Sequence, residues 1–150
     1  MGKWKRAGGM VPVVVLLALF GWTVYAVLRG PTVGEHMTRA EAPIALPEGA
    51  TDVCYWLRAP FWPNTAYEFS VPEKGFRQWA EEKGWPLRDI GDEPIEIYRY
   101  TAFAHLADAE ESVSVADGLY YQCAPEDDDG GIYVVYDRRE GRAYFYAHTR

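Results

Sequence analysis

The amino-acid sequence predicts an α+β fold, with an N-terminal single transmembrane helix followed by a small antiparallel sheet of five or six strands and one packed helix. Three observations predict it. Residues 10–28 contain no charged side chain, several later segments alternate apolar and polar residues with the period of a strand, and one segment near residue 76 has a helical period. The short connections between the predicted strands favour antiparallel pairing.

The apolar run at residues 10–28 predicts the transmembrane helix. As a helix it would be about 28 Å long, close to the ~30 Å hydrocarbon core of a bilayer. Lys3, Lys5 and Arg6 precede it and favour a cytoplasmic N-terminus in the cell membrane. We therefore expect a basic cytoplasmic segment (1–9), a signal-anchor helix in membrane lipid (10–28), a flexible linker (29–46) and an exported domain (47–150).

A second interpretation of the N-terminus stays open. Val24-Tyr25-Ala26 fits the small-x-Ala site at which signal peptides are cleaved. Cleavage near Ala26 would release a secreted soluble domain. In both interpretations the domain leaves the cytoplasm. A short membrane segment, a linker and a small sheet domain form a layout that resembles many bacterial envelope proteins, and this resemblance implies no functional residue.

The linker and the strands follow from local composition. Residues 29–50 hold three Pro and three Gly without sustained periodicity, which is typical of a linker. The segment 113–123 contains Asp117-Gly118, which suggests a bulge within one strand. On the last strand, Tyr144, Tyr146 and His148 should share one face. Strands are predicted at 52–58, 65–71, 95–103, 113–123, 131–137 and 142–148.

The predicted helix has the clearest signals outside the N-terminal run. Phe76, Trp79 and Ala80 form an apolar stripe at helical spacing. Ser70 and Glu73 fit a Ser-x-x-Glu capping box at the start. Gly84 is suited to the left-handed conformation that commonly follows the end of a helix.

The two cysteines, Cys54 and Cys123, predict one disulfide if the domain is exported. A loop of about 70 residues closed in this way would stabilise the fold by roughly 4 kcal/mol in the chain-entropy model. The alternative is two separate buried thiols. Neither cysteine belongs to a Cys-x-x-Cys pair, so no zinc or thioredoxin-like motif is predicted.

The charge distribution argues against nucleic acid as a partner. The chain has 15 basic and 22 acidic side chains, and four of the basic ones lie within residues 1–29, where no acidic residue occurs. Residues 30–150 therefore carry 11 basic against 22 acidic side chains. Phosphate backbones would be repelled by this excess of negative charge.

Three clusters in the sequence are considered as binding sites. Phe61 and Trp62 in a Pro-bracketed loop, with Trp56 nearby, form a candidate stacking surface for sugars or peptides, although strand aromatics commonly pack in cores. The acidic run 126–129 lacks the alternating carboxylates of a calcium-binding EF-hand loop. Arg138, Arg139 and Arg142 mark a small basic turn, either solvated or in contact with an acidic partner.

Enzyme chemistry has weak support from the sequence. His105, Asp108 and His148 are candidates for acid–base chemistry, but nothing fixes them within reach of one another. No serine lies in a Gly-x-Ser-x-Gly motif and no phosphate-binding loop occurs. We therefore predict no catalytic, cofactor-binding or metal-binding residue.

The favoured function is a binding or interaction module at the envelope. Expected partners, besides membrane lipid, are another envelope protein or a glycan. The alternatives are the secreted soluble domain described above and a small envelope enzyme of unknown class.

Overall fold

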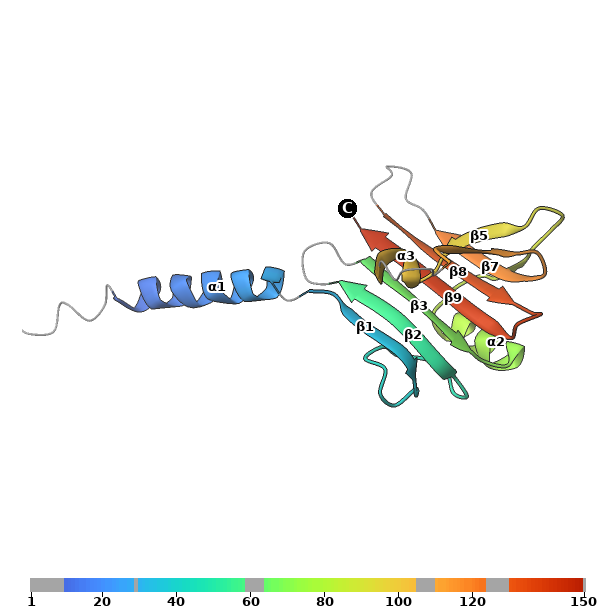
Figure 1. Cartoon of the computed structure of the whole chain (residues 1–150), viewed down its shortest axis with the longest axis horizontal. Helices are drawn as coiled ribbons and strands as arrows, with labels where there is room; N and C mark the ends of the chain where they lie inside the picture. Colours follow the sequence, from blue (N-terminus) through green and yellow to red (C-terminus); the bar gives the residue numbers. More distant parts are fainter. Residues whose placement is uncertain (1–9, 29, 59–63, 105–109, 124–129, 150) are drawn as a thin grey trace, which may run out of the picture. The chain divides into compact units, whose positions relative to one another are not determined.

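The computed structural model describes residues 10–28, 30–58, 64–104, 110–123 and 130–149, and it divides the chain into two units, Met1–Gly30 and Pro31–Arg150. The first unit contains helix α1, Met10–Leu28 (Figure 1). Among the described residues, no helix is both long enough and apolar enough to cross a membrane. The predicted transmembrane signal-anchor and the cell-membrane localisation derived from it are therefore wrong.

The prediction failed because it rested on the absence of charge over 19 positions. A span requires apolarity sustained along its whole length, which is a stricter condition than the absence of charge. The run also contains Gly21, Trp22, Thr23 and Tyr25, which are less apolar than its aliphatic residues. The Thr23 hydroxyl donates a hydrogen bond to the Leu19 carbonyl within the helix.

The second unit is built on a seven-stranded antiparallel sheet with a separate two-stranded sheet beside it. The large sheet has the order β1-β2-β3-β9-β8-β7-β4, and β5 pairs with β6. The elements of this unit are β1 Thr32–Met37, β2 Thr51–Arg58, β3 Asn64–Ser70, α2 Glu73–Glu82, β4 Arg88–Asp89, β5 Ile95–Tyr98, α3 Thr101–Ala104, β6 Ser112–Val115, β7 Gly118–Cys123, β8 Gly130–Asp137 and β9 Arg142–Thr149.

The predicted count of five or six strands was wrong for three identifiable reasons, the first of which is the two-residue strand β4, where we expected no strand. β1 lies within the segment that we expected to be a flexible linker, and its Gly34 faces the Tyr55 ring so closely that a Cβ would lie 2.5 Å from it. The segment 113–123 is two strands, β6 and β7, that belong to different sheets. Turn residues between them end one strand and start another, where we expected a bulge.

The helix prediction over Phe76, Trp79 and Ala80 was confirmed, since all three residues are buried on α2. Gly84 has φ +71°, as expected for the residue after a helix end. The capping box was wrong: Pro72 is the N-cap residue and no side chain caps the helix. Glu73 instead forms ion pairs with Arg77 and Arg138.

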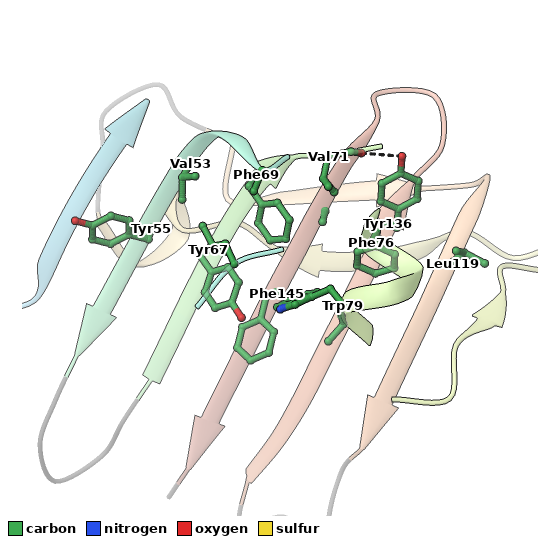
Figure 2. Close-up of a cluster of buried hydrophobic side chains, with 14 residues drawn as sticks. Val53, Tyr55, Tyr67, Phe69, Val71, Phe76, Trp79, Leu119, Tyr136 and Phe145 are labelled. Carbon is green, nitrogen blue, oxygen red and sulfur yellow. Dashed lines mark hydrogen bonds between the residues drawn. The ribbon is translucent and has the colours of Figure 1, made fainter. Parts of the chain in front are cut away.

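Each face of the large sheet is covered by different elements. On one face, α2 packs Phe76 and Trp79 onto Phe69 of β3 and Tyr136 of β8 (Figure 2). The opposite face is covered by α3 and by the β5–β6 hairpin, through the buried clusters around Trp56 and Ile97. Successive strand residues point to opposite faces, so the even-numbered residues of β9 belong to the second face.

The predicted disulfide is absent, and both cysteines are free. Cys54 is buried on β2, whereas Cys123 is exposed at the end of β7. Strands β3, β9 and β8 lie between β2 and β7. At the usual strand spacing, β2 and β7 are therefore about 19 Å apart across the sheet. A disulfide requires Cα atoms within about 7 Å, so the sheet order prevents this bond.

Candidate functional site

The second face of the sheet contains a groove lined mainly by aromatic rings. Its volume is about 280 Å³. Residues from β5, β8 and β9 line it: Glu96, Ile97, Tyr98, Tyr133, Tyr146 and His148. Two other hollows of similar volume occur among the described residues, but neither gathers as many rings. The groove is therefore the best candidate for a ligand-binding site.

The strand register brings these rings together. Tyr146 and His148 are two residues apart on β9 and share a face, as the sequence predicted. Tyr146 lies opposite Tyr133 of β8 in the antiparallel ladder. The β5–β6 hairpin then places Tyr98 across the groove from β9, with ring centroids of Tyr98 and Tyr146 5.8 Å apart.

Tyr146 is the centre of the aromatic cluster. Its ring centroid lies 5.3 Å from that of Phe103 and 5.4 Å from that of His148, with both pairs nearly parallel. The Tyr133 ring also stacks on it, at 5.9 Å. Burial raises the pKa of Tyr146. Contacts on several sides hold the ring in place, so the groove floor is formed before any ligand arrives.

The groove combines one exposed ring with a few polar atoms. Tyr98 is 55 % exposed, which is unusual for a large hydrophobic residue of this domain. The Nδ1 atom of His148 is buried and has no hydrogen-bond partner among the described residues. Glu96 is exposed at the rim and accepts a hydrogen bond from Ser112. The Glu96 carboxylate is thus available to a ligand, whereas the Nδ1 atom of His148 is covered by protein atoms.

The three residues of the predicted binding surface do not form this groove. Trp56 is buried on β2 and packs against Phe103 of α3, with ring centroids 5.2 Å apart. Phe61 and Trp62 lie outside the described residues. The groove residues that sequence reasoning missed are Tyr98 and Tyr133. The alternation of Tyr144, Tyr146 and His148 was the available signal, but strand order was needed to add the neighbours.

The residues considered for enzyme chemistry are only partly placed. His105, Asp108 and the acidic run 126–129 lie outside the described residues. His148 and Glu96 line the same groove, but no hydrogen bond joins them in the described part of the chain. Arg138 of the basic turn is paired with three carboxylates, those of Glu73, Asp89 and Asp117. Its charge is therefore already matched.

The same face continues from the groove into a buried ion cluster. Glu68 of β3 is 1 % exposed and accepts hydrogen bonds from two arginines. Arg99 reaches it at 2.5 and 2.9 Å, and Arg142 of β9 at 3.0 Å. Hydrogen bonds with Glu68 raise the pKa of Arg99, so this guanidinium stays charged. Arg142 also donates to Asp52 of β2, at 2.7 Å.

We expect Tyr144, which lies between this cluster and the groove, to make stability fall at alkaline pH. Burial, with a smaller contribution from Glu68, raises the pKa of Tyr144 to about 12. In the unfolded chain a tyrosine ionises near pH ~10. Between these two values the unfolded state has lost the proton that the folded state keeps, so the free energy of unfolding decreases as pH rises.

Urea denaturation at pH values from about 9 to 12 measures this effect, because a tyrosine of the unfolded chain ionises within this range, near pH ~10. Tyr144→Phe should flatten the decline relative to the wild-type chain. Tyr98→Phe, a change at an exposed tyrosine, serves as the matched control and should leave the decline unchanged. Equal slopes for the wild-type chain and Tyr144→Phe would contradict the assignment.

No protein-family model, curated protein or solved structure matches this chain. A ligand must therefore be inferred from the groove itself: its flat rings, its small volume and its two polar groups. The ion cluster has a different character, because Glu68 is buried and its charge is paired with those of Arg99 and Arg142.

Proposed function

We propose that the domain of residues 31–150 is a binding module that accepts a neutral sugar ring of a glycan in the aromatic groove. The observation that carries this proposal is the convergence of Tyr98, Tyr133 and Tyr146 from three strands on one hollow. This proposal retains the expected binding role and the expected glycan partner. It includes no membrane anchor.

A sugar ring fits the chemistry of the groove. Aromatic faces suit the apolar C–H surfaces of a pyranose, and a ligand site needs few polar groups to fix orientation. The exposed Glu96 carboxylate can accept hydrogen bonds from hydroxyl groups. The net charge of −7 disfavours an acidic sugar, which would be repelled on approach.

The size of the groove favours a small ligand over a protein. A stable protein–protein interface buries about 800 Å² on each partner. The groove encloses about 280 Å³, near the lower limit of typical ligand pockets. It thus accommodates one ring of an oligosaccharide better than it would a broad protein surface.

We expect Tyr98→Ala to weaken oligosaccharide binding by at least about tenfold, the equivalent of ~1.4 kcal/mol. The exposed ring provides stacking surface, and its removal should not disturb the core. The full chain is applied to an array of neutral and acidic oligosaccharides, and the strongest neutral binder is then titrated by calorimetry.

Two control variants separate stacking from other effects. Tyr98→Phe keeps the ring and should retain most of the affinity. Arg88 lines a different hollow, so Arg88→Ala should leave the affinity for the oligosaccharide unchanged. The proposal fails if the wild-type chain retains no neutral oligosaccharide, or if Arg88→Ala weakens binding as much as Tyr98→Ala does.

A further inference from the structure

Two β-bulges meet at the edge of the large sheet, away from the aromatic groove. Between β1 and β2 the pairs Gly34–Tyr55 and Met37–Val53 leave two residues of β1, Glu35 and His36, opposite Cys54 alone. Between β2 and β3 the register shifts in the same way, with Asp52 in the bulge. A bulge redirects a side chain and is common next to functional sites.

Both bulges hold a non-glycine residue in a left-handed backbone conformation. His36 has φ +53° and Asp52 has φ +49°, and no other non-glycine residue in the described part of the chain has a positive φ. This conformation is unfavourable for side chains other than glycine and is found where function requires a special orientation. Here both residues turn toward the same cysteine.

The result is a compact set of three different metal-binding groups. The donor atoms of His36, Asp52 and Cys54 all lie within 4.8 Å of one another. His36 Nδ1 is 2.5 Å from Asp52 Oδ1, and the His36 backbone N–H donates to Cys54 Sγ at 3.4 Å. Cys54 is only 2 % exposed, whereas the His36 side chain faces solvent.

We propose that His36, Asp52 and Cys54 form a Zn²⁺ site, with a water molecule as the fourth ligand. Nitrogen, oxygen and thiolate donors together suit zinc, and three protein ligands plus water complete a tetrahedron. On binding, the Cys54 S–H bond breaks, a Zn–S bond forms and the proton passes to solvent. The solvent-facing side of His36 leaves room for the water.

A small movement of the His36 side chain completes the geometry. Two ligands at ~2.0–2.1 Å from a tetrahedral zinc are about 3.3 Å apart. The imidazole must therefore move outward by about 1 Å from its present hydrogen bond with Asp52, which the exposed ring is free to do. The bound ion would take the place of the shared proton.

Arg142 contacts two of the three proposed ligands, Asp52 and Cys54. It donates to Asp52 Oδ2 at 2.7 Å and to Cys54 Sγ at 3.9 Å, so it fixes the orientation of the carboxylate. Glu68 lies 3.0 Å from the same guanidinium and offsets its positive charge. The charge of Arg142 is thus matched by Glu68, which reduces its repulsion of a bound cation.

Cobalt titration of the untagged full chain under reducing conditions tests the proposal. Co²⁺ replaces Zn²⁺ in such sites, and a cobalt–thiolate bond gives a charge-transfer absorption band in the near ultraviolet. We expect one equivalent of Co²⁺ to produce this band and added Zn²⁺ to abolish it. The proposal is overturned if excess Co²⁺ produces no such band in the wild-type chain.

The two free cysteines provide a matched pair of variants. Cys54→Ser should abolish the band, whereas Cys123→Ser should retain it, because Cys123 is exposed on a distant strand. Loss of the band in Cys123→Ser, with retention in Cys54→Ser, would refute the site. Circular dichroism confirms that each variant is folded.

Two variants at the less buried ligands keep the test independent of the core. Asp52→Asn and His36→Ala should each weaken Co²⁺ binding at least tenfold, while His148→Ala, in the groove, should have no effect. Unchanged affinity in both ligand variants would contradict the proposal. This readout requires no sugar, so it stands or fails separately from the proposed binding function.

Discussion

Replacing Glu68 by alanine is expected to lower the free energy of unfolding by about 3–5 kcal/mol. Glu68 is 1 % exposed and pairs with both Arg99 and Arg142. Its removal leaves two partly buried guanidinium groups without their shared carboxylate, and the cost of keeping them out of water is then uncompensated. Urea denaturation followed by tryptophan fluorescence measures the change.

Glu110→Ala is the matched control because Glu110 pairs with the same Arg99. Its side chain is 79 % exposed, and the ion pair is 3.9 Å long. Exposed pairs of this kind contribute about 0–1 kcal/mol because water screens them. If the two variants lose similar stability, burial of Glu68 is not the reason that its removal is destabilising.

Local sequence patterns correctly predicted helix α2, because the spacing of its apolar residues matches the face that is buried in the fold. The stripe of Phe76, Trp79 and Ala80 is buried on α2, and Gly84 follows the helix end in a left-handed conformation. These features depend on spacing within a few residues. The capping box also looked local, but Glu73 pairs with Arg138, which is 65 residues away, and no side chain caps the helix.

Features that depend on strand order could not be predicted in the same way. The disulfide between Cys54 and Cys123 required β2 and β7 to be neighbours, and three strands lie between them. The segment 32–37 contains a glycine and follows a proline, so its composition resembles a linker. Pairing with β2, where Gly34 accommodates the Tyr55 ring, makes it a strand.

The candidate sites show the same division. The shared face of Tyr146 and His148 follows from the period of a strand, but Tyr98 joins them only through the β5–β6 hairpin. The cluster of His36, Asp52 and Cys54 depends on two register shifts between strands, and no residue pattern in the sequence predicted them. At both bulges a non-glycine residue has positive φ, against its local preference. Sites often lie where local preference and structure disagree.

The N-terminal run shows the limit of composition alone. Absence of charge over residues 10–28 led us to a membrane anchor, and no described helix meets the combined requirement of length and apolarity. The helix itself was predicted correctly as a helix. The error was the inference that this helix crosses a membrane.

Gly118→Ala is expected to lower the free energy of unfolding by about 3 kcal/mol through overpacking. Gly118 begins β7 and lies opposite Asp137 of β8. A Cβ at this position would be 1.8 Å from the backbone oxygen of Tyr136. Because the obstacle is backbone, no side-chain rotation relieves it, and β7 must move away from β8.

The strain should spread to the sheet edge, because the Gly118 carbonyl accepts a hydrogen bond from Ile90 just after β4. We expect amide exchange to accelerate in β4 and β7 of Gly118→Ala, measured beside its urea denaturation. Gly91→Ala is the control: its Cβ would meet no atom within 4 Å, and its stability should change by less than about 1 kcal/mol. Since both variants add the same methyl group, a similar loss in each would show that close backbone approach at Gly118 is not what requires glycine.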